Sequence, residues 1–358
     1  MKRFLKLAII LVSCAAFALS VAACGNGGST KSDGSGLVCK KFGDDEFYTV
    51  TRYYEEDGVD TLDIAAAFHA KYGENEKIGL IKKNAFKGNG TLKSVIIAKT
   101  GDQALEIEEG AFAGMKAIEE ITLPFVGSTE LSDATIMQTA PAENKSTDKM
   151  RSFGYIFGEE EVDGSAAVSL TYGKESATFY IPSTLYKVTV NGVSENGINI
   201  PMYAFCGLTQ VSVIELKGNI VAIGESAFKN MTKLGKINIP ATVKDIYGAA
   251  FEGTPVLKVF GTDLSFDDGA TLENIKDGAF KGTKLTSFVL PASVKTIGES
   301  CFAESSLTAF TFSANIEFVG AYALANSEKL ATINNVPNAE KLSVGVFYGT
   351  AYENDLMA

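Results

Sequence analysis

The strongest constraint on the fold is a short motif that returns along most of the chain: alanine followed by phenylalanine, beside a turn rich in glycine. Its copies, some with one residue changed, are Ala85-Phe86, Ala111-Phe112, Ala204-Phe205, Ala227-Phe228, Ala250-Phe251, Ala279-Phe280, Cys301-Phe302, Ala323-Leu324 and Val346-Phe347. From residue 205 to residue 347 the successive steps are 23, 23, 29, 22, 22 and 23 residues. A fixed period of this kind indicates a repeat architecture, in which each unit packs mainly on its neighbours.

Between these copies lies a second pattern, apolar-x-x-apolar-x-apolar, which proline often closes. Leu234, Ile237 and Ile239, followed by Pro240, form one example. The last two apolar positions alternate with a polar one, which is the period of a half-buried strand. A further apolar pair, such as Val243 and Ile246, turns the chain inward again before the next motif. One coil of this size cannot offset its own ordering entropy, so the coils must stack.

These features predict a repeat solenoid in the leucine-rich-repeat range of periods. Short parallel strands are expected on one face, and short 3₁₀ or helical turns that carry the Ala-Phe pair on the other. The phenylalanines are expected in the core. We expect an N-terminal cap over residues 37–75, with a helix near Leu62 to Tyr72, repeats over 76–124, an insertion over 125–183, and repeats with a short C-terminal cap over 184–358.

The combination of apolar-x-x-Ile-x-Leu-Pro, Val-x-x-Ile-Gly and Ala-Phe-x-Gly resembles the BspA-type class of bacterial leucine-rich repeats over most of residues 75–350. The segments from Phe153 to Gly158 and from Phe179 to Ser183 are similar to an insertion between repeats in that family. The resemblance implies a right-handed solenoid on a bacterial surface, associated with adhesion to host or matrix proteins. Leu324, Cys301 and the longer spacing around residues 261–271 depart from the pattern in individual coils.

Residues 1–23 are expected to be a lipoprotein signal peptide. Three cations precede an apolar run that begins at Leu7, as in secretory signals. Val21-Ala22-Ala23-Cys24 resembles the bacterial lipobox, which implies cleavage and a lipid on Cys24. Residues 24–36 are rich in glycine and serine and read as a flexible tether. The alternatives are a chance cysteine and permanent insertion of an apolar run that is near the lower length limit for a membrane span.

The net charge of the chain limits the classes of partner that it can bind. Removal of residues 1–23 takes three cations and no anion from the net charge of −11, which leaves −14. Such a chain is a poor partner for nucleic acid or anionic lipid surfaces. We therefore expect membrane contact only through the lipid anchor, an extracellular protein or glycan as ligand, and a monomer.

The sequence offers little for catalysis, so we expect no enzyme, no catalytic residues, no cofactor and no metal. His69 is the only histidine, and no Gly-x-Ser-x-Gly or phosphate-loop motif is present. Cys206 and Cys301 fall inside the repeat motif and are expected to be buried thiols. The run from Asp263 to Asp268 approaches a calcium loop but lacks the turn glycine and the closing glutamate, which favours a solvated acidic loop.

Two surfaces are candidates for ligand binding. The first is the outward face of the predicted strands, with Lys187, Glu215, Lys236, Asn238, Lys258, Phe260, Ser287 and Thr311. The second is the insertion, with Tyr155, Phe157, Tyr172 and Tyr180, whose rings could equally pack beneath the loop.

The function predicted is protein binding or adhesion by a lipid-anchored protein on the outer face of the bacterial cell membrane. One alternative is a glycan-binding or glycan-active lipoprotein that uses the insertion. Another is an envelope scaffold without an external ligand.

Overall fold

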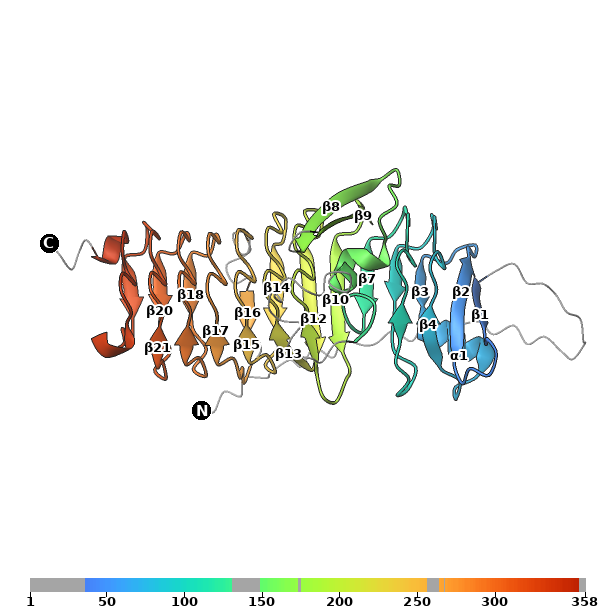
Figure 1. Ribbon diagram of the computed structural model, residues 1–358, viewed down its shortest axis with the longest axis horizontal. Helices are drawn as coiled ribbons and strands as arrows, with labels where there is room; N and C mark the ends of the chain where they lie inside the picture. The colour runs from blue at the N-terminus through green and yellow to red at the C-terminus, as the bar shows by residue number, and fades with distance from the viewer. Residues whose placement is uncertain (1–35, 131–148, 173–174, 256–263, 267, 354–358) are drawn as a thin grey trace, which may run out of the picture. The chain divides into compact units, whose positions relative to one another are not determined.

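The structure is a computed structural model in which residues 36–130, 149–172, 175–255, 264–266 and 268–353 are described (Figure 1). The described residues belong to one compact unit. The predicted signal peptide and most of the predicted tether, including Cys24, lie outside the described residues. The compact unit is built from short strands that stack from one coil to the next, so the predicted solenoid of mainly parallel strands is confirmed.

The first face of the solenoid is a seven-stranded sheet in which all strand pairs are parallel. Its strands are, in order along the sheet, β3 (Thr61–Asp63), β5 (Ser94–Ile96), β7 (Glu120–Leu123), β10 (Lys187–Gly192), β12 (Val213–Gly218), β14 (Lys236–Ile239) and β16 (Leu264–Phe266). Beyond β16 the same row continues as a parallel three-stranded sheet, β18 (Ser287–Val289), β20 (Ala309–Thr311) and β22 (Thr332–Asn334) (Figure 1). Strands β7, β10, β12 and β14 contain the apolar-x-apolar segments that the sequence pattern predicts, whereas β5, β18 and β20 end one residue before the second apolar position.

A second face carries very short parallel strands. They form a six-stranded sheet of β11 (Ile198–Ile200), β13 (Ile220–Ile223), β15 (Asp245–Ile246), β17 (Asn274–Ile275), β19 (Thr296–Ile297) and β21 (Phe318–Val319). Each holds the apolar residue that turns the chain inward, such as Ile246, which is fully buried. The sequence pattern predicts only one sheet, because four of these six strands are two residues long and bury one side chain, which is too little to show an alternation.

The Ala-Phe turns form a third column with its own hydrogen-bond ladder. The N–H of Phe205 donates to the carbonyl of Ala227 at 2.7 Å, and the N–H of Phe228 donates to that of Ala250 at 2.8 Å. The rings stack as well: the centroids of Phe205 and Phe228 lie 5.3 Å apart, and those of Phe228 and Phe251 5.1 Å apart. The small alanine lets successive backbones approach to hydrogen-bonding distance, and the phenylalanine fills the space inside each coil.

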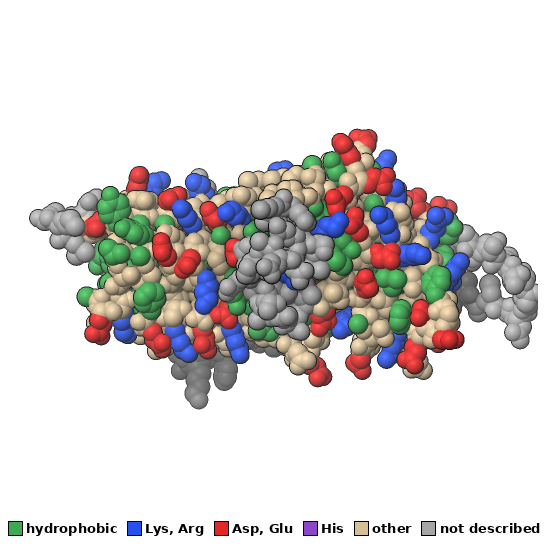
Figure 2. All heavy atoms as spheres, in the orientation of Figure 1, with side chains coloured by type: hydrophobic (Ala, Val, Ile, Leu, Met, Phe, Trp, Pro, Cys, Tyr) green, Lys and Arg blue, Asp and Glu red, His purple; other side chains and the backbone are tan. Residues whose placement is uncertain are grey.

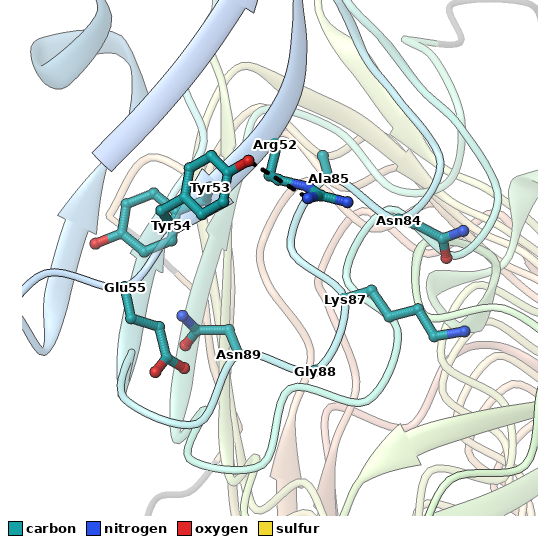
Figure 3. A pocket seen from close by; sticks show the side chains of 9 residues that line it. All are labelled: Arg52, Tyr53, Tyr54, Glu55, Asn84, Ala85, Lys87, Gly88 and Asn89. Carbon is teal, nitrogen blue, oxygen red and sulfur yellow. Dashed lines mark hydrogen bonds between the residues drawn. The ribbon is translucent and has the colours of Figure 1, made fainter. Parts of the chain in front are cut away.

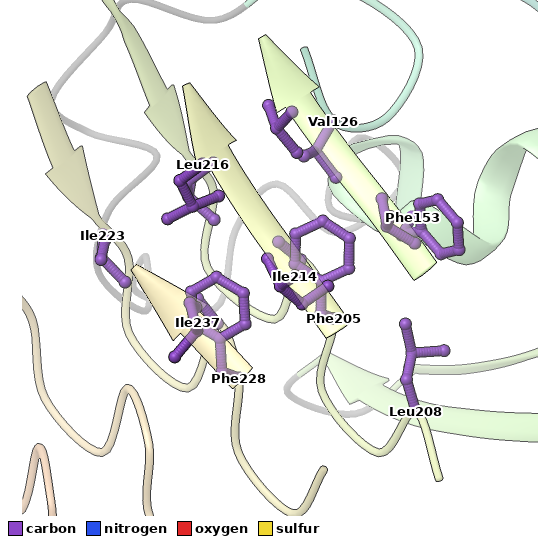
Figure 4. Close-up of a cluster of buried hydrophobic side chains, with 14 of the residues drawn as sticks. Val126, Phe153, Phe205, Leu208, Ile214, Leu216, Ile223, Phe228 and Ile237 are labelled. Atoms are coloured by element: carbon purple, nitrogen blue, oxygen red, sulfur yellow. The ribbon is translucent and has the colours of Figure 1, made fainter. Parts of the chain in front are cut away.

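The core runs through the stacked coils. Phe205, Phe228, Ile214 and Ile237 lie together between the turn column and the first sheet (Figure 4). Cys301 takes the alanine position of its coil and is fully buried there. All twelve of the largest fully buried side chains are phenylalanines, which agrees with the prediction that these rings are core.

The N-terminal end of the solenoid is closed by a different arrangement. Strand β1 (Gly36–Lys40) pairs antiparallel with β2 (Tyr48–Tyr54), and β2 pairs parallel with β4 (Ile78–Ile81), which pairs with β6 (Glu106–Ile107). The expected helix is α1 (Ile64–Tyr72). Asp63 caps it by accepting the N–H of Ala66 at 3.0 Å, and Phe68 anchors it in the core.

The predicted insertion proves to contain part of a coil. Residues 152–158, with the 3₁₀ helix η3 (Phe153–Ile156) after η2 (Lys149–Arg151), occupy a position in the turn column. The N–H of Phe112 donates to the carbonyl of Ile156 at 2.9 Å, and the N–H of Phe153 donates to that of Ala204 at 2.8 Å. The inserted elements described beyond this turn are the antiparallel hairpin β8 (Ser165–Tyr172) and β9 (Glu175–Pro182).

Candidate binding surface

The outward positions of the seven-stranded sheet hold several of the side chains that the sequence analysis placed on the binding face. Ile214 and Leu216 of β12 are buried, whereas Glu215 between them points outward. In-register parallel pairing then aligns the outward residues of neighbouring strands. Lys187 of β10 therefore lies beside Glu120 of β7.

Five residues at the centre of this face form a connected group, which we call the Lys187 cluster: Glu120, Tyr186, Lys187, Glu215 and Lys217. The Lys187 Nζ lies 3.3 Å from a Glu120 carboxylate oxygen and 3.5 Å from one of Glu215. Lys217 Nζ lies 3.0 Å from Glu215, and the Tyr186 hydroxyl donates to Glu120 at 2.7 Å. Tyr186 is 40% exposed, so its ring faces solvent beside the charges.

The charges of the cluster stabilise one another. Partial burial disfavours the charged amine of Lys187, but the carboxylates of Glu120 and Glu215 outweigh it and raise its pKa above the ordinary value. Partial burial likewise works against the Glu215 carboxylate, but Lys217 and Lys187 bring its pKa below the usual range. The hydrogen bond to Glu120 raises the pKa of Tyr186. Lys187 and Glu215 are therefore both ionised at neutral pH, with opposite signs, whereas the Tyr186 hydroxyl keeps its proton. Acidic and basic side chains are interspersed in the same way on the visible side of the described chain (Figure 2).

Two further predicted residues, Lys236 and Asn238, lie on β14. Lys236 is exposed at an outward position. Asn238 lies at the next outward position and bonds to the neighbouring strand: its side-chain amide accepts the N–H of Leu216 at 3.0 Å and donates to the carbonyl of Leu216 at 2.8 Å. Asn238 thus extends the ladder between β12 and β14, and its amide is not free for a ligand.

The remaining predicted face residues fall elsewhere. Ser287 and Thr311 lie at outward positions of the three-stranded sheet, next to Val289, which is 66% exposed. Lys258 and Phe260 lie outside the described residues. The strand that pairs with β14 in their coil is β16, residues Leu264–Phe266. In this long coil, the strand of the first sheet therefore lies later in the sequence than Lys258 and Phe260, which the sequence pattern placed on it.

Two of the four aromatic residues predicted as an insertion site are buried. Tyr155 is 8% exposed and Phe157 is fully buried, so the prediction that these two rings contact a ligand is wrong. The reason is that residues 152–158 form a turn of the solenoid, where Phe157 packs on Phe153 at 5.3 Å between ring centroids. Tyr180 is half-buried on β9, and its N–H donates to the carbonyl of Gly158. The backbone of Tyr172 ends β8, and its side chain lies outside the described part.

A pocket that the sequence analysis missed opens at the N-terminal end of the turn column, with a volume of about 580 Å³ (Figure 3). It lies between the end of β2 and the turn that carries Phe86. Tyr53 takes the place of the turn phenylalanine here, donating its N–H to the carbonyl of Ala85 at 2.8 Å. Some polar groups at the rim are engaged: Arg52 donates to the Tyr54 hydroxyl at 3.4 Å, and Glu55 accepts the N–H of Gly90 at 2.6 Å. The buried Tyr53 hydroxyl and the side-chain amino group of Asn89 have no hydrogen-bond partner within the described chain. No sequence motif marks this site, because it arises where a full turn is missing.

Residues with catalytic chemistry are dispersed in the described part of the chain. His69 lies on α1, 3.3 Å from the carbonyl oxygen of Glu76 and 3.6 Å from a Glu74 carboxylate oxygen. Burial raises the pKa of the Cys206 thiol to about 11 and that of the Cys301 thiol further, so neither is a ready nucleophile. Among the described residues, no group of three or more histidine, cysteine, aspartate or glutamate side chains is placed to hold a metal ion. In the predicted acidic loop, Asp263 and Asp267 lie outside the described residues, and Asp268 is exposed.

Within the same described ranges, no helix has the length and apolar character needed to span a membrane.

The fold defines a leucine-rich-repeat solenoid with an outward sheet face, and the comparison with known families agrees. The BspA type leucine rich repeat region matches residues 75–149, 175–258 and 262–354, in six copies. The chain therefore belongs to the BspA-type leucine-rich-repeat family. No curated protein is matched by the chain.

Several solved structures of bacterial leucine-rich-repeat proteins are similar to the chain. A protein from T. pallidum is 21% identical, covers 56% of this chain and 95% of its own length, and has a TM-score of 0.39. A protein from Bacteroides ovatus is 14% identical over 88% of this chain and 91% of its own length, with a TM-score of 0.35. A leucine rich cell surface protein from Faecalibacterium prausnitzii is 14% identical over 88% and 97%, with a TM-score of 0.33.

Proposed function

We propose that this chain is a lipid-anchored bacterial surface protein that binds an extracellular protein, with the Lys187 cluster at the centre of the contact. Membership of the BspA-type repeat family supports an interaction role. The cluster supports the location, because it combines an exposed tyrosine with charges of both signs on a sheet held rigid by the stacked coils. Tyrosine beside charged groups is typical of the residues that dominate protein interfaces.

The energetics of the cluster favour exchange of partners. Ion pairs that remain in contact with solvent contribute only about 0–1 kcal/mol each. Lys217 is 57% exposed and Glu120 40% exposed, so charges of a ligand can replace these outer members of the cluster at little cost. Because the cluster holds both signs, it selects for a complementary arrangement of charges in the ligand. Such complementarity contributes to specificity and to the association rate more than to affinity.

The direct test measures capture of a panel of purified host matrix proteins by the immobilised mature chain. The double variant Tyr186→Ala with Lys187→Ala should weaken capture by at least about tenfold, as expected for truncation at the centre of an interface. The matched control is Lys295→Ala with Phe318→Ala. It also removes one ion-paired lysine and one exposed aromatic ring, but from the six-stranded sheet.

Equal loss in the two double variants would contradict this location. Failure of the unsubstituted chain to capture any matrix protein would favour the envelope scaffold. Capture on a glycan array would instead favour the glycan-binding alternative, for which Tyr155 and Phe157 now give no support because they are buried.

The proposed anchor is tested separately on Cys24. Cys24→Ser should release the protein from the membrane fraction, because a serine hydroxyl cannot form the thioether that carries the lipid. The N-terminal peptide should also lose the mass of the acyl groups. Cys14→Ser, inside the predicted signal, is the matched control and should leave anchoring unchanged. Membrane retention of a Cys24→Ser protein whose N-terminal peptide no longer contains residues 1–23 would rule out the lipid anchor at this residue.

A further inference from the structure

The hairpin of β8 and β9 has a free edge, which is formed by β8. The two strands pair antiparallel over their full length, from Ser165 opposite Pro182 to Tyr172 opposite Glu175, with no bulge. The edge of β9 that faces away from β8 is partly covered by the turn column, since the N–H of Tyr180 donates to the carbonyl of Gly158 at 3.0 Å. Strand β8 forms the other, outer edge of the hairpin (Figure 1).

The hydrogen-bond pattern identifies which backbone groups of β8 point outward. Antiparallel pairs alternate between hydrogen-bonded and non-hydrogen-bonded positions. The N–H of Ser183 donates to the carbonyl of Gly164 at 2.9 Å, so every second pair from there is hydrogen-bonded. Ser165 and Pro182 then form a non-hydrogen-bonded pair, which agrees with the missing N–H of proline. Consequently Ala167, Ser169 and Thr171 direct their backbone N–H and C=O groups away from β9. No backbone hydrogen bond to another segment reaches these three residues within the described chain.

The side chains leave this edge accessible. Val168 and Leu170 are buried toward the body of the protein, whereas Ala167, Ser169 and Thr171 are exposed. Proteins usually protect an edge strand with a charged residue, a proline or a bulge. Strand β8 has none of these, because its residues are Ser, Ala, Ala, Val, Ser, Leu, Thr and Tyr. A uniform, uncharged edge of this length is a template for another strand.

Charge at the start of β8 defines the ligand further. Four acidic residues, Glu159, Glu160, Glu161 and Asp163, precede the strand. Lys149 pairs with Glu159 at 2.7 Å and Lys87 pairs with Glu160 at 2.6 Å. The exposed carboxylates of Glu161 and Asp163 have no ion pair within the described residues. A strand that adds antiparallel to β8 places its C-terminal end beside them.

We propose that β8 is a docking edge for an extended peptide segment of a partner protein. The segment adds as an antiparallel third strand of the hairpin, with β-branched and small residues along its length and basic residues at its C-terminal end. Backbone hydrogen bonds to Ala167, Ser169 and Thr171 supply the affinity, as in other cases of strand addition. The carboxylates of Glu161 and Asp163 favour the antiparallel direction of the added segment, because they attract its basic C-terminal end. This site is separate from the Lys187 cluster and does not depend on it.

The test uses a synthetic peptide of alternating threonine and valine that ends in two lysines, titrated into the mature chain by fluorescence anisotropy. Ser169→Pro should weaken binding at least about tenfold, because proline removes one outward N–H but none that bonds to β9. Ser169→Ala is the matched control, since it loses only the hydroxyl contact with Thr178 at 2.8 Å. It should bind within about twofold of the unsubstituted chain. If Ser169→Pro fails to fold, Ser169→Lys replaces it, because a charge on the edge keeps the N–H but repels the basic peptide.

Hydrogen exchange gives a second readout. Peptide binding should slow exchange at Ala167, Ser169 and Thr171 and leave the amides of Val168 and Leu170, which already bond to β9, unchanged. Replacing the two lysines of the peptide by glutamates should weaken binding. The double variant Glu161→Gln with Asp163→Asn should reduce the difference in affinity between the lysine peptide and the glutamate peptide. Equal binding to Ser169→Pro and Ser169→Ala, or protection located elsewhere, would overturn the proposal. Neither result would bear on the Lys187 cluster.

Discussion

At the scale of single residues, the turn column depends on backbone conformations that L-amino acids rarely adopt. The residue before each Ala-Phe pair has a positive φ: 63° at Gly278, 52° at Ser300 and 57° at Tyr322. In this left-handed region a Cβ costs about 1–2 kcal/mol, whereas glycine has no such penalty. Glycine before the Ala-Phe pair therefore indicates a left-handed backbone conformation. Coils that have serine or tyrosine at this position are strained there.

Exchange of residues at this position in two adjacent coils should change stability in opposite directions. Gly278→Ala should lower the free energy of unfolding by about 1 kcal/mol, because alanine is strained at positive φ. The nearest atoms to an added Cβ are 4.0 Å away, so no steric clash contributes. Ser300→Gly should raise the free energy of unfolding by up to about 1 kcal/mol. The substitution relieves the strain of a positive φ, and the greater entropy of glycine in the unfolded chain offsets part of that gain. Urea unfolding measures both.

The paired design separates conformation from packing. Lower stability in both variants would mean that the Ser300 side chain contributes contacts that exceed its strain. No loss in Gly278→Ala would show that this turn relaxes to accept a Cβ, against the φ argument.

At the scale of elements, the sequence predicts those strands in which two inward side chains flank an outward one. Ile214 and Leu216 of β12 and Ile237 and Ile239 of β14 are of this kind, and both strands form as expected. Four strands of the second sheet, β15, β17, β19 and β21, are two residues long and contribute a single buried side chain, so they carry no period of their own. Only their stacking on neighbouring coils makes them strands.

The candidate site was only partly predictable for the same reason. Lys187 and Glu215 follow from alternation along their strands, but their 3.5 Å approach depends on register between coils that are about a repeat apart. Tyr186 precedes its strand and was not selected. The turn at residues 152–158 lacks the Ala-Phe motif, so its aromatic residues were assigned to an insertion. Hydrogen bonds to the coils on both sides, invisible in the sequence, make it part of the core.

At the scale of the whole solenoid, stability is approximately the sum of coils and of the interfaces between neighbours. A ring inside the stack belongs to two interfaces. Phe251 lies 5.1 Å from Phe228 and 5.0 Å from Phe280 between ring centroids, and it is buried. Phe347 in the last described turn is only partly buried, where its contacts are Phe312 at 6.5 Å and Tyr352 at 5.3 Å. The same residue type therefore has two different roles along the molecule.

This difference predicts unequal effects of one substitution. Phe251→Ala should lower the free energy of unfolding by about 3–5 kcal/mol, because it leaves a cavity between two coils. Phe347→Ala should cost about 1–2 kcal/mol, since its ring is only partly buried and no coil of the described chain covers it on its C-terminal side. Hydrogen exchange should show a matching pattern in space. Phe347→Ala should speed exchange only in the coils next to the C-terminal end of the described chain, whereas Phe251→Ala should speed it on both sides of the centre. Equal costs, or the same exchange pattern for both, would mean that the chain unfolds as one globular unit, because only a linear array of neighbours makes the position of a ring matter this much.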